Sequence, residues 1–214
     1  MRKAVEMLVA MLVVVLVAIS AAGGTQDWAT SGGFTNGVAS CTNSHETVIF
    51  SGGTSTWNSV EVPRVYFSPN YDGPGNDCIS NLVAEIGKAK SDIRVAAYQF
   101  TSQPIADALV RAAKRGVAVG MIVDPSCMNT RNSKVGLCLS NGVSVAVDSK
   151  HSIFHNKTMV IDKKTVVTGS FNFTANAEYH NAENMWIMVN TNAASMCVSN
   201  WMVHASHSEV LLLK

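Results

Sequence analysis

From residue 60 to the C-terminus, hydrophobic positions recur with the two periods that distinguish strands from helices. Cys78–Lys90 places its apolar side chains on one helical face, and residues 103–116 form a second amphipathic helix that ends at Gly116. A short helix in a polar loop is expected after residue 124, and a closing helix over residues 193–209. Short apolar runs typical of strands occupy residues 62–68, 92–100, 117–124, 143–148, 157–162, 165–168 and 184–190.

The order of these elements predicts the fold class. Strands that alternate with helices of about a dozen residues are typical of α/β proteins. We therefore expect a mixed β-sheet flanked by helices on both faces, within one domain that spans residues 60–214. The chain has 214 residues, of which 47% are hydrophobic and 14% charged, so it can bury a core.

The first 59 residues differ from the rest of the chain. Arg2 and Lys3 precede an unbroken apolar run over residues 7–19, and small residues follow at 20–22. This order predicts a signal peptide over residues 1–22 and a secreted or periplasmic protein, or a membrane-tethered one if the segment is retained. Residues 23–59 are rich in Gly, Ser and Thr and are expected to form an extension without assignable chemistry. Within it, only Thr47–Phe50 resembles a strand.

Net charge limits how the protein can bind a polyanion. Residues 1–22 contain two of the 16 basic and one of the 15 acidic residues, so the remainder of the chain is neutral. A broad nucleic-acid surface is usually basic, and any such binding must therefore come from local clustering. Lys150, His151, Lys157, Lys163 and Lys164 form the densest basic cluster. We expect the first three to flank or bind substrate, and the last two to lie at a solvated hairpin tip.

The chain contains five cysteines, Cys41, Cys78, Cys127, Cys138 and Cys197. None belongs to a CxxC pair or a Cys/His ligand spacing, which argues against a zinc site. Disulfides are expected outside the cytosol, and we predict a Cys127–Cys138 bond across the polar loop. Cys41–Cys78 is a weaker candidate, and Cys197 would then be free or bonded to another chain.

One segment concentrates polar, reactive side chains. From residue 155 it reads HNKTMVIDKKTVVTGSFNFT. If the two adjacent lysines form a turn between two strands, Lys157 faces Ser170 and His155 faces Asn172. Because side chains alternate along a strand, this register gathers all four on one face of a hairpin.

These four side chains suit phosphoryl chemistry. Lysine is a cation and Ser and Asn donate hydrogen bonds, so Lys157, Ser170 and Asn172 can bind phosphoryl oxygens. A neutral His155 can attack phosphorus, and Glu183, just before the last strand, is our candidate for the carboxylate that fixes its tautomer. The segment lacks the carboxylate cluster that a catalytic magnesium ion needs, so we expect neither a metal nor a cofactor.

The spacing His155-x-Lys157-x4-Asp162-x6-Gly169-Ser170-x-Asn172 resembles the signature of the phospholipase D superfamily at every defined position. From about residue 60 to 201, the chain looks like the small secreted bacterial endonucleases of that superfamily. The resemblance implies a phospholipase D-like fold and a two-step, metal-independent mechanism. His155 would form a phosphohistidine that water hydrolyses, and a second histidine would protonate the leaving oxygen.

The resemblance also implies a homodimer. The family site uses two motifs and this chain has one, so two copies must bring their His155 side chains together. Asp162 belongs to the motif and is counted with the catalytic set. It lies at the predicted turn, however, so we expect a positional role, such as pairing with a lysine, rather than a reactive one.

Three functions are compatible with these features. We favour a non-specific endonuclease that acts on DNA and RNA. A hydrolase of phospholipid headgroups is an alternative because both substrates are phosphodiesters, but the chain is short and shows no exposed apolar helix beyond the signal peptide. A non-catalytic binding protein is a third alternative, against which the complete motif argues.

Other residues are assigned structural roles. His151 is expected beside the substrate rather than on a metal, and His204 and His207 on the surface of the last helix. Phe171 and Phe173 are expected in the core, although aromatic rings there could also stack on bases. Trp186 is likewise expected in the core.

Overall fold

The computed structural model describes residues 62–70, 73 and 75–213 of the chain. The predicted signal peptide, the Gly/Ser/Thr-rich extension, the Thr47–Phe50 strand and Cys41 lie outside the described residues. Within the described part, no helix is both long enough and apolar enough to cross a lipid bilayer.

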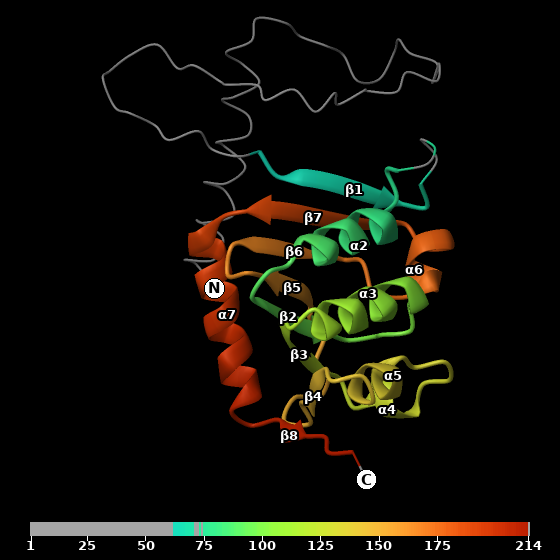
Figure 1. Ribbon diagram of the computed structural model, residues 1–214. Helices are drawn as coiled ribbons and strands as arrows, with labels where there is room; N and C mark the ends of the chain where they lie inside the picture. The colour runs from blue at the N-terminus through green and yellow to red at the C-terminus, as the bar shows by residue number, and fades with distance from the viewer. Residues whose placement is uncertain (1–61, 71–72, 74, 214) are drawn as a thin grey trace, which may run out of the picture. The chain divides into compact units, whose positions relative to one another are not determined.

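The described residues form one mixed β-sheet (Figure 1). Its strands are β1 (Arg64–Ser68), β2 (Asp92–Ala97), β3 (Ala118–Val123), β4 (Ser144–Val147), β5 (Lys157–Ile161), β6 (Thr165–Gly169), β7 (Glu183–Val189) and β8 (Glu209–Val210). Their order across the sheet is β1-β7-β6-β5-β2-β3-β4-β8. β2, β3 and β4 are parallel neighbours, and the other neighbouring pairs are antiparallel. The mixed sheet confirms the predicted fold class.

Helices cover both faces of the sheet. They are α2 (Cys78–Lys88), α3 (Gln103–Lys114), α4 (Ser126–Asn129), α5 (Val135–Leu139), α6 (Ala175–Tyr179) and α7 (Thr191–Ala205). α2 and α3 lie side by side over one face (Figure 1), where the main core buries Ile93 and Val95 of β2. On the opposite face, Ala96 packs against Trp201 of α7, whose Nε1 donates to the carbonyl of Val95 at 2.9 Å.

Local sequence signals set the helix ends. The Asp77 side chain accepts a hydrogen bond from an amide in the first turn of α2, and Asn190 does the same for α7. Pro104 lies in the first turn of α3, where its missing N–H costs nothing. Gly116 follows α3 with a φ of 90°, which glycine adopts without strain.

Three aromatic side chains test the predicted core. Phe171 and Phe173 are each 1% exposed, so they are core residues, and the alternative that they stack on bases is wrong. Trp186 is 41% exposed, which contradicts its assignment to the core. The reason is strand alternation: its neighbours Met185 and Ile187 face the core, and Trp186 therefore faces away from it.

The predicted Cys127–Cys138 disulfide is wrong for this structure, because both thiols are free. The Cys127 Sγ donates to the carbonyl of Tyr98 at 3.2 Å, whereas Cys138 is buried in α5. Burial raises the pKa of Cys127 to about 11 and that of Cys138 to about 12. Both thiols therefore stay protonated at neutral pH. Cys78 is also buried and free among the described residues.

Candidate functional site

Four strands begin or end around the motif residues at one end of the sheet. β2 and β6 finish there, and β5 and β7 begin there, because neighbours in the order β7-β6-β5-β2 are antiparallel. Lys157 is the first residue of β5, Gly169 the last of β6 and Glu183 the first of β7. We call this the motif end of the sheet.

The hairpin register differs by one residue from the prediction. Ile161, not Asp162, pairs with Thr165. The turn is centred on Asp162 and Lys163, which have φ values of 52° and 53°, and Lys164 N donates to the Ile161 carbonyl at 3.0 Å. A left-handed conformation is accessible to aspartate in turns, so the turn forms one residue earlier than the lysine pair indicated.

A bulge at the end of β6 then sets the positions of Ser170 and Asn172. The amides of Ser170 and Phe171 both donate to the carbonyl of Asn184, at 3.1 and 3.2 Å, which is the pattern of a β-bulge. At Gly169, with a φ of 149°, a Cβ would collide with that same carbonyl, so the motif requires glycine here. In a regular strand, a register shift of one residue would move every side chain to the opposite face. The positions of Ser170 and Asn172 are therefore set by the bulge and not by a continuation of the hairpin.

His155 and Lys157 share an aromatic neighbour that the sequence did not single out. The rings of His155 and Tyr98 lie 4.4 Å apart between centroids, and Lys157 Nζ lies 5.0 Å from the Tyr98 centroid. Lys157 Nζ also donates to the His155 carbonyl at 3.1 Å. His155 itself is exposed. Tyr98 thus holds the lysine and the histidine close together beside solvent.

Ser170 and Asn172 keep hydrogen-bonding capacity available. The Ser170 Oγ accepts from the Asn184 amide at 3.1 Å, so its own hydrogen can be donated elsewhere. The Asn172 Oδ1 is buried and has no hydrogen-bond partner among the described residues. A half-turn of the amide would put its NH2 group in the same place. An unsatisfied buried polar atom is uncommon and marks a place for a ligand group.

Glu183 lies beside the lysine rather than on the histidine. Its Oε1 accepts from Asn181 Nδ2 at 3.0 Å, and no hydrogen bond joins it to His155 in the part of the chain that the structure describes. Burial lowers the pKa of Lys157, and the negative charge of Glu183 partly offsets this shift. Among the described residues, no contact therefore supports the predicted role of Glu183 in orienting His155.

Asp162 is remote from the motif end. Five residues of extended strand, roughly 16 Å, separate it from Lys157. Its carboxylate accepts from the backbone amides of Lys90, Ser91 and Asp92 at 2.7 to 3.2 Å. Asp162 is thus positional, and its partners are these amides rather than a lysine side chain. These contacts support the expected positional role and give no sign of the catalytic role with which the motif also credits Asp162.

The residues of the predicted basic cluster do not all lie at the motif end. Lys163 and Lys164 lie at the turn with Asp162, at the far end of β5 from Lys157. Lys150 is exposed in the loop that precedes β5. The positive charge at the motif end is therefore smaller than the sequence indicated.

Three histidines meet at a buried aspartate. Asp148 follows β4, and its carboxylate lies within hydrogen-bonding distance of His151, His204 and His207. The side chains of His204 and His207 are only 15% and 17% exposed, so their assignment to the surface is wrong. Burial raises the pKa of Asp148, but the hydrogen bonds from the three histidines outweigh this effect and hold it well below its usual range.

The sequence contains little signal for the residues that were missed. Tyr98 directly follows a buried strand, and Asp148 follows another, so both stand at strand ends where functional residues gather in α/β sheets. The contact between Asp148 and His204 joins residues 56 positions apart, which no local pattern predicts.

Comparisons with known proteins agree with this geometry. Residues 82–201 match the family model described as "Cardiolipin synthase, PLD-like domain". A protein named phospholipase D from Rickettsia conorii is 36% identical over 146 residues, which is 68% of this chain and 72% of the relative. A mitochondrial cardiolipin hydrolase from Mus musculus is 33% identical over 53% of this chain and 51% of its own length.

Two solved structures share the fold. Nuc from Salmonella typhimurium, described as a phospholipase D family member, is 31% identical with a TM-score of 0.64; the match covers 71% of this chain and 99% of Nuc. NucT from Helicobacter pylori is 24% identical with a TM-score of 0.62, over 70% of this chain and 99% of NucT.

Proposed function

The chain belongs to the phospholipase D superfamily and is a phosphodiesterase of that family, and on this premise we propose that it is a metal-independent, non-specific endonuclease. One observation supports this most directly. The exposed His155 and the half-buried Lys157 share Tyr98 as a neighbour, at the same end of the sheet as a serine and an asparagine with free hydrogen-bonding capacity.

In the proposed reaction, a neutral ring nitrogen of His155 attacks the phosphorus of the diester. The bond from phosphorus to the leaving oxygen breaks, and a second, protonated histidine donates its proton to that oxygen. Water, deprotonated by this second histidine, then attacks the phosphohistidine and releases His155. Lys157, Ser170 and Asn172 stabilise the charge on the non-bridging oxygens.

The second histidine comes from a second copy of the chain in this proposal. The chain has one motif, and the side chain of His151, the nearest other histidine in sequence, is held by Asp148. A two-fold axis through the motif end would place one His155 opposite the other. The proposed active unit is thus a homodimer.

Nucleic acid is the substrate class that we propose. The sequence resemblance to small secreted endonucleases supports it, as does the exposure of His155 and Ser170, which an extended polymer could reach. Phe67 of β1 is 65% exposed and pairs with Asn184 at the motif end. An exposed aromatic ring beside the site offers a face on which an unpaired base can stack. The predicted signal peptide supports export to the periplasm or beyond.

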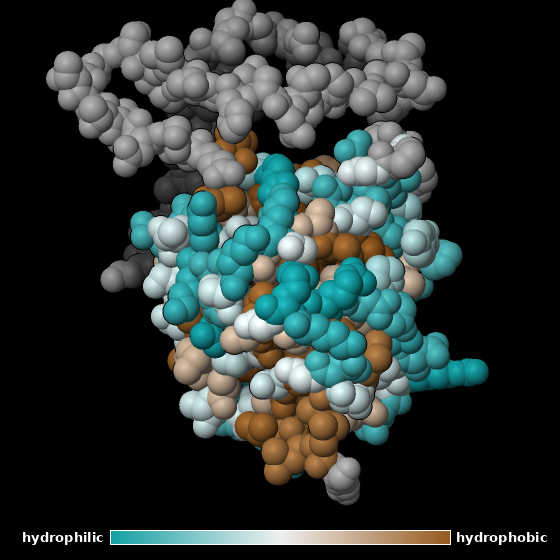
Figure 2. All heavy atoms as spheres, in the orientation of Figure 1, coloured by the Kyte–Doolittle hydropathy of each residue, from teal (hydrophilic) through white to brown (hydrophobic). Residues whose placement is uncertain are grey.

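Phospholipid hydrolysis is a second candidate. The relatives named phospholipase D and mitochondrial cardiolipin hydrolase favour it. The sequence indicated no exposed apolar helix beyond the signal peptide, but α7 does expose three apolar side chains, Met196, Met202 and Val203. Figure 2 shows a further apolar patch at the C-terminal segment, where Val210, Leu212 and Leu213 are exposed. Such surfaces can contact lipid.

A direct comparison of substrates separates the two candidates. The mature protein is assayed on plasmid DNA, single-stranded RNA and phosphatidylcholine vesicles, with chelator added when the reaction starts. We expect DNA nicking without added metal, and choline release at least about 100-fold slower at equal phosphodiester concentration. His155→Asn is the matched control and should remove nicking while the protein stays folded. Faster choline release than nicking would assign the protein to phospholipids.

A further inference from the structure

A second cluster of reactive side chains lies outside the proposed catalytic set. Asp148 directly follows β4, His151 lies in the loop before β5, His204 is in the last turn of α7, and His207 follows that helix. The Asp148 side chain is fully buried, and the His151 side chain is 45% exposed. Two separate segments of the chain, the β4–β5 loop and the end of α7, therefore converge on one point.

The spacing of the ligand atoms resembles a coordination sphere. The Asp148 Oδ2 lies 2.8 Å from His204 Nδ1, 3.1 Å from His207 Nε2 and 3.2 Å from His151 Nδ1. All four ligand atoms lie within 4.8 Å of one another. A tetrahedral zinc ion with bonds of about 2.0–2.1 Å holds its ligand atoms about 3.3 Å apart. The observed distances from Oδ2 to the three ring nitrogens differ from this ligand–ligand separation by about half an ångström or less.

Hydrogen bonds from three histidines and one backbone amide would together fill every acceptor position of the Asp148 carboxylate. His204 Nδ1 and His207 Nε2 both lie next to Oδ2, and His151 Nδ1 lies 3.2 Å from both carboxylate oxygens. The Asp148 Oδ1 also accepts from the Lys150 amide at 3.0 Å. A cation between the nitrogens and the oxygen would satisfy all four ligands at once, and the Lys150 amide would orient the carboxylate from outside, as outer partners of metal ligands commonly do.

We propose that Asp148, His151, His204 and His207 bind one zinc-like divalent transition ion. Imidazole nitrogen favours zinc, copper and nickel, whereas magnesium and calcium favour oxygen ligands. Four protein ligands fill a tetrahedral shell and leave no open position for substrate. The site is therefore structural, and it is separate from the metal-independent chemistry proposed for His155.

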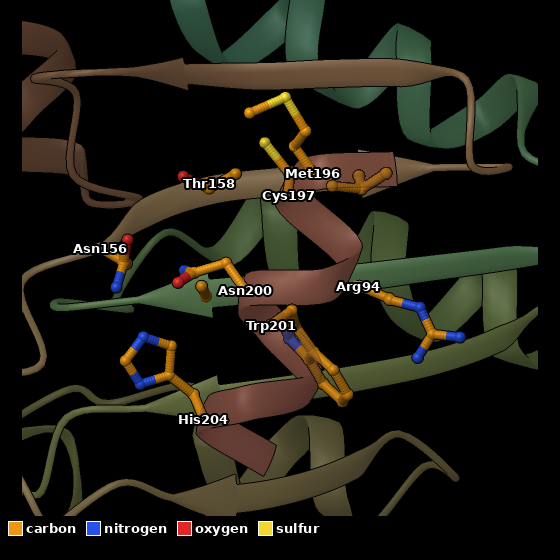
Figure 3. Close-up of a pocket in the computed structure, with 10 residues that line it drawn as sticks. Arg94, Asn156, Thr158, Met196, Cys197, Asn200, Trp201 and His204 are labelled. Atoms are coloured by element: carbon orange, nitrogen blue, oxygen red, sulfur yellow. The ribbon is translucent and has the colours of Figure 1, made fainter. Parts of the chain in front are cut away.

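The ion would fix the loop that carries the nucleophile. Residues 148–156 connect β4 to β5 and contain both His151 and His155. The Phe154 amide donates to the buried Asp124 at 2.7 Å, and the Phe154 ring lies 5.0 Å from that of His204. Figure 3 shows the His204 ring directed toward Asn156, the residue after His155, across the pocket between α7 and β5. The ion would tie this loop to the end of α7.

Metal binding tests the proposal without any activity assay. Mature protein that carries no histidine tag is stripped of metal and titrated with Zn2+ by calorimetry and with Co2+ by visible absorption. We expect one ion per chain, an absorption band of tetrahedral Co2+, and a higher melting temperature with Zn2+. His204→Gln should weaken Zn2+ binding by about 100-fold or more, whereas His180→Gln, an exposed histidine outside the cluster, should leave it unchanged.

Two further variants keep the test decisive if His204→Gln fails to fold. Asp148→Asn removes the anionic ligand, and His151→Gln removes the most exposed one, so at least one should fold as judged by circular dichroism. The wild type binding no Zn2+ at stoichiometric concentration would overturn the proposal. The proposal would also be overturned if folded His151→Gln and His204→Gln variants both bound Zn2+ as tightly as the wild type. Neither result would bear on phosphohistidine formation, so failure of this site and of the proposed nuclease remain distinguishable.

Discussion

At the scale of single residues, Tyr98 explains how an exposed histidine and a partly buried lysine stay close together. The tyrosine backbone is itself fixed, because its amide donates to the Asn156 carbonyl at 2.8 Å. The ring therefore has a defined position beside β5, next to both His155 and Lys157. We regard Tyr98 as a positioning residue, since it acts through these two side chains.

Replacing Tyr98 should lower activity in proportion to the loss of its ring. A cation–π contact contributes about 0.5–2 kcal/mol, so Tyr98→Ala should reduce kcat/KM by roughly 2- to 30-fold. Tyr98→Phe keeps the ring and should stay close to wild type. Steady-state kinetics on DNA measure the effect, with melting temperatures as a control for folding. Equal losses in both variants would mean that the hydroxyl group, not the ring, matters.

At the scale of elements, Asp162 joins the β5–β6 turn to the start of β2. Backbone hydrogen bonds from Ser91 and Lys90 outweigh the effect of burial and lower the pKa of Asp162 below its ordinary value. A carboxylate with a lowered pKa in the folded state stabilises the protein above its unfolded pKa of about 4. This stabilisation is lost as the pH falls through the folded-state pKa.

Asp162→Asn should therefore reduce the free energy of unfolding by about 1–3 kcal/mol at pH 7, because the hydrogen bonds from three backbone amides lose their charged acceptor. The difference from wild type should shrink as the pH is lowered from 5 to 3. Urea unfolding at several pH values measures it. Lys163→Asn, in the same turn, is the control and should change stability by less than about 0.5 kcal/mol. A difference that is independent of pH would contradict this role.

Hydrophobic periodicity predicted the strands and helices well, since alternation and amphipathic faces are local properties. β5, β6 and β7 begin or end within one residue of the expected bounds, and α2 and α3 start where expected. The hairpin register was not predictable, because it depends on positive φ values at Asp162 and Lys163. The short α6, between Phe173 and Glu183, was also missed.

The candidate site was predictable only in part, for a related reason. The motif spacing identified His155, Lys157, Ser170 and Asn172, which the structure places at one end of the sheet. Contacts between distant segments, such as Tyr98 with His155 or Asp148 with His204, depend on the tertiary fold and leave no periodic trace in the sequence.

At the scale of the whole molecule, the proposed mechanism requires two chains. If each active site uses both His155 side chains, a dimer with one His155→Asn subunit has no complete site. Wild type and His155→Asn are mixed in equal amounts and allowed to exchange subunits. Activity per total protein should then fall to about a quarter of the wild-type value, since only wild-type pairs act.

Light scattering on the same samples should report a dimer. Mixing with Lys163→Asn, whose substitution lies far from the motif end, should leave the activity per total protein near the wild-type value. Half of the wild-type activity in the His155→Asn mixture would mean that each chain acts alone, and the homodimeric site would then be wrong.

The covalent intermediate tests the central role of His155 most directly. Internally 32P-labelled DNA is mixed with the enzyme and quenched in alkali within milliseconds, because a phosphohistidine survives base and is lost in acid. We predict label bound covalently to the protein, mapped by mass spectrometry to a peptide that contains His155, and none on His155→Asn. Rapid cleavage with no labelled protein, or undiminished cleavage by His155→Asn, would contradict the account.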